Sequence, residues 1–541
     1  MNTRKKTVCG VLAVILALMF LTCGDDPDTD GGGNKTLTGE ITISPAGPLT
    51  INIELTATYT GDEEVSYQWK KDNGNVGTNS DKYTPTEAGS YTVTVSASGY
   101  NSKTSAAVIV NLPITVEGSN LAAKLTWLSL NAASNSTYIL EVSADEAIAP
   151  HTLSYADKSN ITIILKGSGT QRIVSLSSSG SLFTVESGVT MVLDENIILQ
   201  GISSNNTSLI RVDSGGTLKM EDGSKITGNT NNNTGGGVSV NEGTFTMSGG
   251  EISGNTAEYG GGVCITNEHG TFIMVGGKIS SNTAAWTGGG VQIWRGTFTM
   301  NNGKISDNTT GYGGGVCVND GGLSGNGTFN LNDGEISGNT SNKGGGGGVN
   351  VGNDGIFVMQ GGKISDNSAD ADSWAGGGGV NVFQGTFTMA SGEISDNTVS
   401  GGECGGGGVY VYEGTFAMQG GKISGNIAAS VEDDFAGGGG VNVSEGTFTM
   451  TGGEISGNVA EQGGGVYVYN TTFCIVTGTI YGADESNTNL GNTADNSAAL
   501  AVHGDIGTAE HGTFSGETWT SNGTLTSTDG MISVVNGEFV E

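Results

Sequence analysis

The sequence predicts an all-β protein in which a small β-sandwich precedes a parallel β-helix, a solenoid of short strands. A unit of Gly-Gly-Gly-Val, Gly-Thr-Phe-x-Met and Gly-Gly-(Lys/Glu)-Ile-Ser-(Gly/Asp)-Asn recurs between Gly215 and Gly482, and its isoleucines are 25 to 32 residues apart. This period is typical of a solenoid. Glycine supplies 96 of the 541 residues and costs about 1 kcal/mol at each helical position, so it disfavours helices.

Each repeat contains two segments with the alternation of a half-buried strand. Val238 and Val240 flank a serine, and Phe245 and Met247 flank a threonine. Alternate residues of a strand point to opposite faces, so each apolar pair shares one face. Phenylalanine precedes isoleucine by seven residues in nine repeats. We therefore expect both side chains to stack in columns through the core.

Two polar columns are also predicted, because equivalent residues of a parallel solenoid lie one strand spacing apart. The residue before each isoleucine mostly alternates between lysine and glutamate, and one adjacent pair, Lys278 and Lys304, breaks the pattern. An asparagine three residues after each isoleucine suits a sharp corner and predicts a ladder of side-chain amides. Its members are Asn229, Asn255, Asn282, Asn308, Asn339, Asn367, Asn397, Asn426 and Asn458.

The first 22 residues read as a signal peptide, with three basic residues before an apolar run at residues 11–20. Phe20-Leu21-Thr22-Cys23 resembles the lipobox of bacterial lipoproteins, and its loose form is similar to spirochaete lipoboxes. The resemblance implies a lipid on Cys23, followed by an acidic tether over residues 23–36. The alternative is a secreted protein in which Cys23 has no such role.

Residues 37–112 have alternating strands with aromatic residues. The segments around Leu55, Trp69 and Tyr91 resemble strands B, C and F of an immunoglobulin-like domain, with Trp69 in the core and Tyr91 as the tyrosine corner. Ala57 and Val93 stand where many such domains have a disulfide. The resemblance implies a bacterial Ig-like module that serves as a stalk.

Residues 113–214 are expected to form an N-terminal cap and the first coils, residues 215–482 the repetitive coils, and residues 483–541 the last coils and a cap. Within the first part, residues 119–128 predict a short amphipathic helix that covers the open end. An end cap is needed because a bare terminal coil leaves strand edges unpaired.

The Gly-Gly-Gly-Val and Ile-Ser-x-Asn repeats resemble the right-handed parallel β-helix proteins of the pectin-lyase-like superfamily. Within it they are most similar to repeat-bearing surface lipoproteins of spirochaetes. That superfamily contains lyases, hydrolases and adhesins, so the resemblance implies a fold more than an activity.

No catalytic, cofactor or metal site is predicted. Beyond the leader the chain has three arginines, Arg172, Arg211 and Arg295, few for an enzyme that neutralises sugar carboxylates. Cys264 and Cys317 share the middle position of Val-x-Val, which we expect to face outward with free thiols.

A ligand is expected at one corner of the solenoid. The distance from each isoleucine to the next repeated valine varies from 11 to 18 residues, and binding residues concentrate in such variable connections. The alternative is tolerated insertion without a ligand. The candidate contact residues are Tyr259, Trp286, Tyr312, Asp370, Asp372, Trp374, Asp433, Asp434 and Phe435.

The net charge of −33 disfavours nucleic acid as a partner. The expected protein is a non-enzymatic lipoprotein, exported and anchored to the bacterial outer-membrane surface by its lipid. It acts as an adhesin or in surface display, and binds a glycan or a protein of a host or neighbouring cell. The alternatives are a carbohydrate-active lyase or hydrolase and a structural surface component without a ligand.

Overall fold

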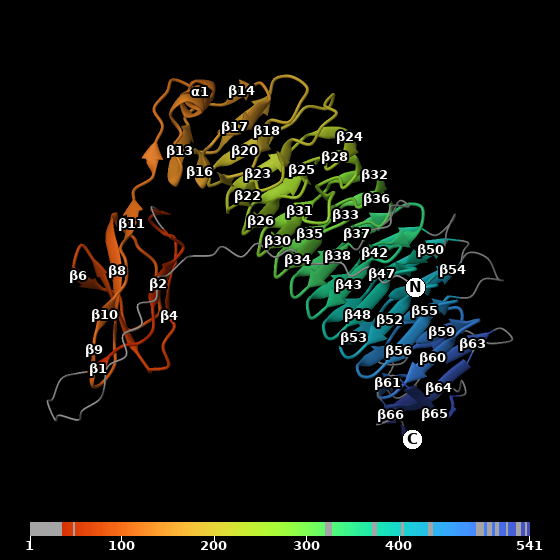
Figure 1. The fold of residues 1–541 in the computed structure, drawn as a ribbon. Helices are drawn as coiled ribbons and strands as arrows, with labels where there is room; N and C mark the ends of the chain where they lie inside the picture. Colours follow the sequence, from red (N-terminus) through yellow and green to blue (C-terminus); the bar gives the residue numbers. More distant parts are fainter. Residues whose placement is uncertain are drawn as a thin grey trace, which may run out of the picture. The chain divides into compact units, whose positions relative to one another are not determined.

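The computed structural model is almost entirely β, as the sequence predicts (Figure 1). It contains two compact units: the first comprises residues 35–46, 54–84 and 89–108, and the second comprises residues 49–53, 85–88 and those from 109 onward. The structure describes residues 35–46, 49–319, 327–370, 376–401, 405–430, 437–482, 492–494, 500–503, 508–515, 518–525, 532–535 and 538–540.

Most of the N-terminal strands form two sheets with a buried tryptophan between them, and β1 (Lys35–Thr36) pairs with β9 (Tyr100–Asn101) in a separate small sheet. Trp69 is fully buried, and its ring stacks on Tyr83 of the other sheet with centroids 5.8 Å apart. Its indole Nε1 donates a hydrogen bond to the carbonyl of Ser80 at 2.9 Å. One sheet consists of β3 (Leu49–Thr50), β11 (Val108–Asn111), β8 (Gly89–Ser96), β5 (Ser66–Lys71), β6 (Gly74–Val76) and β10 (Lys103–Thr104), and the other of β2 (Ile41–Ser44), β4 (Leu55–Tyr59) and β7 (Lys82–Tyr83).

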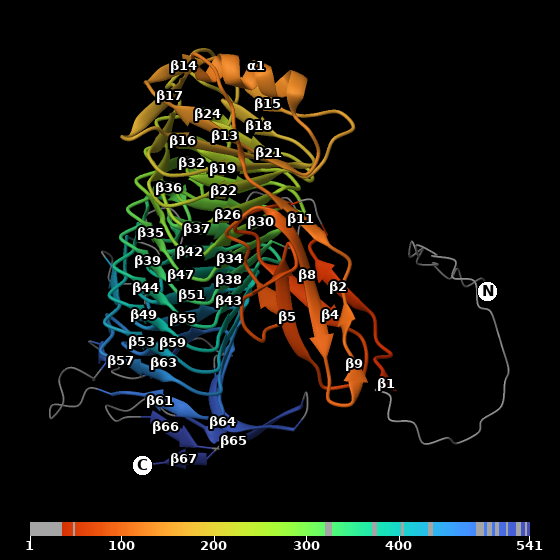
Figure 2. The ribbon, with the colours of Figure 1, turned by 90° about the vertical axis from the view of Figure 1, so that its left-hand side faces the viewer.

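The second unit is a parallel β-helix, so the predicted fold class is confirmed (Figures 1 and 2). We name its sheets after their residues. The 16-stranded Phe sheet runs from β12 (Ile114–Thr115) to β65 (Thr518–Thr524), and the 15-stranded Ile sheet from β14 (Glu146–Ile148) to β67 (Glu538–Val540). The 13-stranded Val sheet closes the core. It consists of β15 (His151–Leu153), β18 (Phe183–Val185), β21 (Ile210–Val212), β25 (Val238–Val240), β29 (Val263–Ile265), β33 (Val291–Ile293), β37 (Val316–Val318), β42 (Val349–Val351), β47 (Val380–Phe383), β51 (Val409–Tyr412), β55 (Val441–Ser444), β59 (Val466–Tyr469) and β63 (Leu500–His503).

A fourth sheet, the rim sheet, lies where the sequence predicts only a corner loop. In each repeat it follows the asparagine and precedes the glycine run. Its ten strands are β24 (Thr230–Thr234), β28 (Thr256–Tyr259), β32 (Thr283–Thr287), β36 (Thr309–Tyr312), β40 (Thr340–Ser341), β45 (Ser368–Asp370), β50 (Thr398–Gly401), β54 (Ile427–Ser430), β58 (Val459–Ala460) and β62 (Thr493–Ala494). The loop prediction is therefore wrong for this segment.

The core stack of phenylalanines is confirmed. Successive rings from Phe245 to Phe473 lie parallel, with centroids 4.5 to 5.0 Å apart and interplanar angles of 4 to 11°. All nine are fully buried beside the isoleucine and valine columns. The spacing is close to the strand spacing of a sheet, so the backbone register places each ring on the next.

The asparagine ladder is also confirmed and is longer than predicted. From Asn255 onward, each Nδ2 donates to the Oδ1 of the next asparagine at 2.9 to 3.1 Å. Asn205 adds a bond to Asn229 at one end, and Asn492 accepts from Asn458 at the other. These side chains are buried, so the ladder satisfies polar groups that water does not reach.

The alternating charges before the isoleucines form ion pairs between neighbouring coils. Lys304 Nζ lies 2.9 Å from Glu335 Oε1, and Lys225 Nζ lies 3.2 Å from Glu251 Oε1. Lys278, which has Lys304 as its neighbour in the column, pairs with a carboxylate outside the column. Its Nζ lies 3.7 Å from Asp307 Oδ2.

The predicted N-terminal helix is present as α1 (Leu121–Asn131), at the β13 (Ser136–Val142) end of the solenoid (Figure 2). Asn120 caps it by accepting a hydrogen bond from the backbone of Ala123 at 2.8 Å. Leu121, Leu125 and Leu128 are buried at 4% exposure or less, so one apolar face of α1 covers the first coils.

The middle residues of the Val strands face away from the core, as expected, but other parts of the chain cover them. Cys264 and Cys317 point away from the phenylalanine core, yet both are fully buried, and neither forms a disulfide. The chain returning from the rim sheet covers them. A side chain at Gly260, where φ is +64°, would meet Cys264 Cβ at 2.9 Å. Glycine therefore permits both the turn and the close packing of the returning chain.

Candidate functional site

Four of the predicted contact residues lie on strands of the rim sheet. Tyr259, Trp286, Tyr312 and Asp370 belong to β28, β32, β36 and β45, respectively. Strands β28, β32 and β36 are direct neighbours, so their aromatic residues follow one edge of the solenoid. The other predicted site residues lie outside the described residues: Cys23, Asp372, Trp374, Asp433, Asp434 and Phe435.

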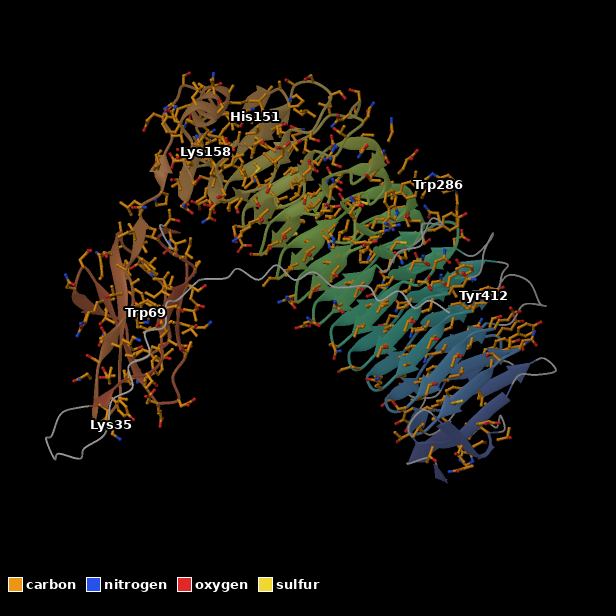
Figure 3. All side chains as sticks on the ribbon, viewed as in Figure 1. Lys35, Trp69, His151, Lys158, Trp286 and Tyr412 are labelled. Atoms are coloured by element: carbon orange, nitrogen blue, oxygen red, sulfur yellow. The ribbon has the colours of Figure 1, made fainter. Side chains whose placement is uncertain are left out.

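The rim aromatic residues contact different partners and do not form one cluster. The Tyr259 ring meets Trp294 edge to face, with centroids 5.2 Å apart. Trp286, labelled in Figure 3, is 47% exposed, and Lys343 Nζ lies 5.5 Å from its ring centroid. Neither Trp294 nor Lys343 is predicted from the sequence, because each follows a strand end that the repeat pattern does not mark.

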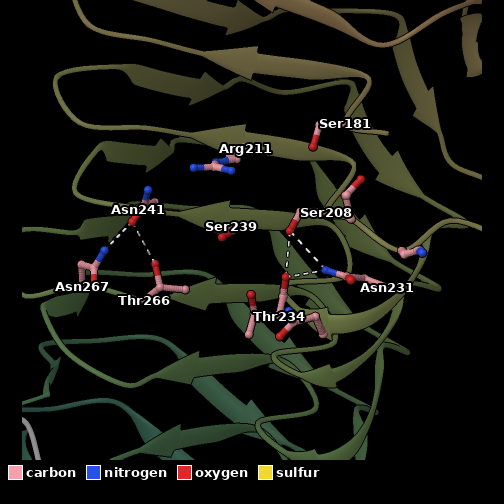
Figure 4. Close-up of a pocket in the computed structure, with 12 residues that line it drawn as sticks. Ser181, Ser208, Arg211, Asn231, Thr234, Ser239, Asn241, Thr266 and Asn267 are labelled. Carbon is pink, nitrogen blue, oxygen red and sulfur yellow. Dashed lines mark hydrogen bonds between the residues drawn. The ribbon is translucent and has the colours of Figure 1, made fainter. Parts of the chain in front are cut away.

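A polar pocket of about 370 Å³ opens beside the first strand of the rim sheet (Figure 4). Its volume lies within the roughly 300 to 1,000 Å³ typical of small-molecule sites. Every lining residue is polar, and they come from successive coils. They are Ser181, Asn206, Thr207, Ser208, Arg211, Asn231, Asn233, Thr234, Ser239, Asn241, Thr266 and Asn267.

The pocket lies at the coil where the rim sheet, which packs outside the Val sheet, has its first strand. Strand β24 is the first rim strand, and Ser208 Oγ donates to the carbonyl of Thr234 in it at 2.8 Å. The next two coils have Ala257 and Ala284 at the register position of Asn231, and both alanines are buried. The asparagine-rich run at residues 230–234 is the sequence signal that marks the pocket.

Hydrogen bonds hold the outer wall of the pocket. Asn241 Nδ2 donates to Asp213 Oδ1 at 3.1 Å, and the amide of Asn267 donates to Asn241 Oδ1. Arg211 Nε also donates to Asp213 Oδ1, at 2.6 Å, while the arginine side chain stays 51% exposed. Asp213 therefore orients both the amide and the guanidinium toward the opening.

One buried polar atom in the pocket wall has no hydrogen-bond partner. Asn231 is 3% exposed, and its Nδ2 donates to the carbonyl of Thr234 at 2.6 Å. Its Oδ1 has no partner in the structure. An unsatisfied buried acceptor costs about 1 to 3 kcal/mol.

An aromatic pair lies in the coils next to this pocket. Tyr259 is the register partner of Thr234, which lines the pocket. Trp294 follows β33, and its backbone N–H donates to Ile265, the residue before the lining Thr266. The Tyr259–Trp294 pair is therefore one strand spacing from the polar lining. Hydroxyl and amide groups beside flat rings are suited to a polyhydroxylated ligand such as a sugar.

Cys264 and Cys474 do not have the character of nucleophiles. Burial raises the pKa of the Cys264 thiol. Burial, and to a smaller extent the negative charge of Glu510, raise the pKa of the Cys474 thiol to about 11. Thiols become reactive when the surroundings lower the pKa. In the described part of the chain, no three histidine, cysteine, aspartate or glutamate side chains gather as a metal site would require.

No helix in the described ranges is long and apolar enough to span a membrane. Comparison of the chain with models of protein families, with curated proteins and with solved structures finds no significant match.

Proposed function

We propose that this protein is a non-enzymatic surface lipoprotein of a bacterial envelope, acting as an adhesin or in surface display by binding a glycan. The polar pocket at the start of the rim sheet carries the proposal. Its twelve lining residues offer hydroxyl, amide and guanidinium groups to sugar hydroxyls, and the Tyr259–Trp294 pair in the adjacent coils offers an apolar surface.

The composition of the pocket favours binding over turnover. Glycoside hydrolysis ordinarily uses two carboxyl groups on opposite sides of the bond that breaks. None of the twelve lining residues has a carboxyl group, and the nearby Asp213 already accepts from Arg211 and Asn241.

Binding is tested by titrating the protein with neutral oligosaccharides and following the heat of binding. Arg211→Gln and Asn241→Ala remove two groups at the pocket mouth and should each weaken binding about tenfold, the effect of losing one or two hydrogen bonds. Asn332→Ala replaces an exposed asparagine elsewhere on the solenoid and should bind like the parent. Unchanged binding by both pocket variants would rule this pocket out, and release of cleaved sugar would favour the enzyme alternative.

The anchor is tested separately, because it depends on Cys23. Replacing Cys23 with alanine removes the thiol that accepts the lipid, so the protein should move from the detergent phase to the aqueous phase. Unchanged partitioning would contradict the lipoprotein assignment.

A further inference from the structure

A column of side chains at the end of the Val sheet forms a second surface feature, far from the pocket along the chain. It comprises the last residue of four consecutive Val strands, β47, β51, β55 and β59. The register pairs Phe383 with Tyr412, Tyr412 with Ser444, and Ser444 with Tyr469. Phe383 and Tyr469 are each 37% exposed, and Tyr412 is half-buried.

Rings in this column lie face to face along the solenoid axis. Phe383 and Tyr412 are stacked with centroids 5.4 Å apart and an interplanar angle of 9°. The other face of Tyr412 is therefore turned toward the next coil, where the column has Ser444 in place of a ring. Tyr412 is labelled in Figure 3 on the blue-green part of the solenoid.

Ser444 interrupts the aromatic column between Tyr412 and Tyr469, and we call the place of this short side chain the ring slot. Tyr412 and Tyr469 lie two strand spacings apart, about 9.5 Å. Carbon contacts of about 3.5 to 4.0 Å on both sides would fill 7 to 8 Å of that distance. A flat aromatic ring would leave this remainder empty and touch only one wall, whereas a puckered pyranose ring with its axial hydrogens is thicker and fits better.

Polar groups stand beside the ring slot. Glu413 and Glu445 follow Tyr412 and Ser444 in the turns that leave the Val sheet, and both are exposed with positive φ of 48° and 56°. The negative charge of Glu445 raises the pKa of the Tyr412 phenol most, and burial and the charge of Glu413 raise it further. Carboxylates beside the slot can accept hydrogen bonds from sugar hydroxyls, and they would repel an anionic sugar.

We infer that the ring slot between Tyr412 and Tyr469 binds a neutral pyranose unit of a glycan. This inference rests on the proposed glycan-binding function and adds a second site of different character. The pocket lies at the first rim strand and the ring slot beside β55. A glycan long enough to reach both would bind more tightly than a short one through avidity.

The test fills the ring slot with a residue that the column already accepts. Ser444→Tyr continues the aromatic stack of its neighbours, so the variant should fold while the gap disappears. Ser444→Ala keeps the gap and serves as the matched control. Neutral oligosaccharides are titrated into the full-length protein, with Ser444 variants made both alone and together with Arg211→Gln and Asn241→Ala.

The inference predicts that Ser444→Tyr weakens binding at least about tenfold in both backgrounds, because the sugar loses its contacts with the tyrosine rings. Ser444→Ala should stay within about threefold of its parent. If Ser444→Tyr binds like its parent while the pocket variants lose binding, the ring slot is wrong and the proposed function stands. If no neutral glycan binds the parent protein, both are overturned. Equal affinity for a polyanionic glycan would also overturn the inference.

Discussion

One asparagine per coil links each turn of the solenoid to the next. Asn367 shows the full pattern. Its Nδ2 donates to the carbonyl of Ile336 and to Asn397 Oδ1, both at 2.9 Å. Its Oδ1 accepts from the backbone and the side chain of Asn339 at 3.0 and 2.9 Å. One side chain thus satisfies four buried groups, which is why alanine cannot replace it without leaving unpaired partners.

Asn367→Ala should lower the free energy of unfolding by about 3 kcal/mol, because each abandoned buried group costs about 1 to 3 kcal/mol and some will find water. The urea midpoint measured by circular dichroism reports the change. Exposed Asn342→Ala, which leaves the ladder intact, should have little effect. Equal midpoints for the two variants would mean that the ladder does not stabilise the fold.

The ion pairs of the lysine and glutamate column predict a dependence on pH. The Ser337 hydroxyl and then Lys304 lower the pKa of Glu335 from its ordinary value of 4.5. A lowered folded-state pKa gives stability that is present above the unfolded value and is lost as the pH falls through the folded value.

Glu335→Gln should therefore cost up to about 1 kcal/mol at pH 7, as exposed ion pairs do, and nearly nothing near pH 3. Urea midpoints of parent and variant at the two pH values give the difference directly. A difference that persists at pH 3 would mean that packing, and not charge, distinguishes the two side chains.

Among the elements, the Phe strands contribute the most regular packing. Phe387 in β48 (Thr386–Met389) is fully buried between Phe357 and Phe416, at centroid distances of 4.6 and 4.7 Å. Phe387→Ala should cost about 3 to 5 kcal/mol, as truncation of a buried aromatic residue does. Thr388→Ala changes the opposite face of the same strand and should cost little. Thermal unfolding of both variants compares the two faces, and equal losses would contradict their assignment.

The elements also show what the sequence can and cannot predict. The Phe, Ile and Asn columns were predictable, because a constant offset within every repeat must become a stack in a parallel solenoid. The rim sheet was not, because its short strands differ in sequence and length between repeats. Burial of Cys264 depends on the backbone packing of Gly260, which leaves no side-chain pattern to detect.

The polar pocket was missed for a related reason. The pocket forms where the rim sheet starts, so it depends on the difference between two neighbouring coils. A pattern that recurs in every repeat cannot reveal such a difference. Only the asparagine-rich run at residues 230–234 marks it in the sequence. The predicted residue nearest to it, Tyr259, was assigned to a loop although it lies in β28.

At the scale of the whole molecule, the solenoid is held together by contacts between neighbouring coils. Each Phe, Ile, Val and rim strand pairs with its counterpart one coil away. Stability in such arrays is close to a sum of terms for single coils and for their interfaces. Coils can therefore be removed in whole units, provided that every column still finds a compatible neighbour.

The column of lysine and glutamate residues before the isoleucines makes the number of removed coils matter. Because lysine and glutamate alternate, removing two coils keeps the alternation, whereas removing one coil sets like charges side by side.

At the adjacent lysines Lys278 and Lys304 the opposite holds, because removing one coil there restores the alternation. Deleting residues 279–304 joins Lys278 to Ile305 and makes Glu335 its neighbour, which restores strict alternation, whereas deleting residues 336–363 sets Glu335 beside Glu393. The protein with the first deletion should have a free energy of unfolding about 1 kcal/mol higher than the protein with the second, and high salt should reduce this difference. Thermal unfolding of the two shortened proteins measures this gap, and no difference at low salt would show that solvent, not neighbouring coils, neutralises the column.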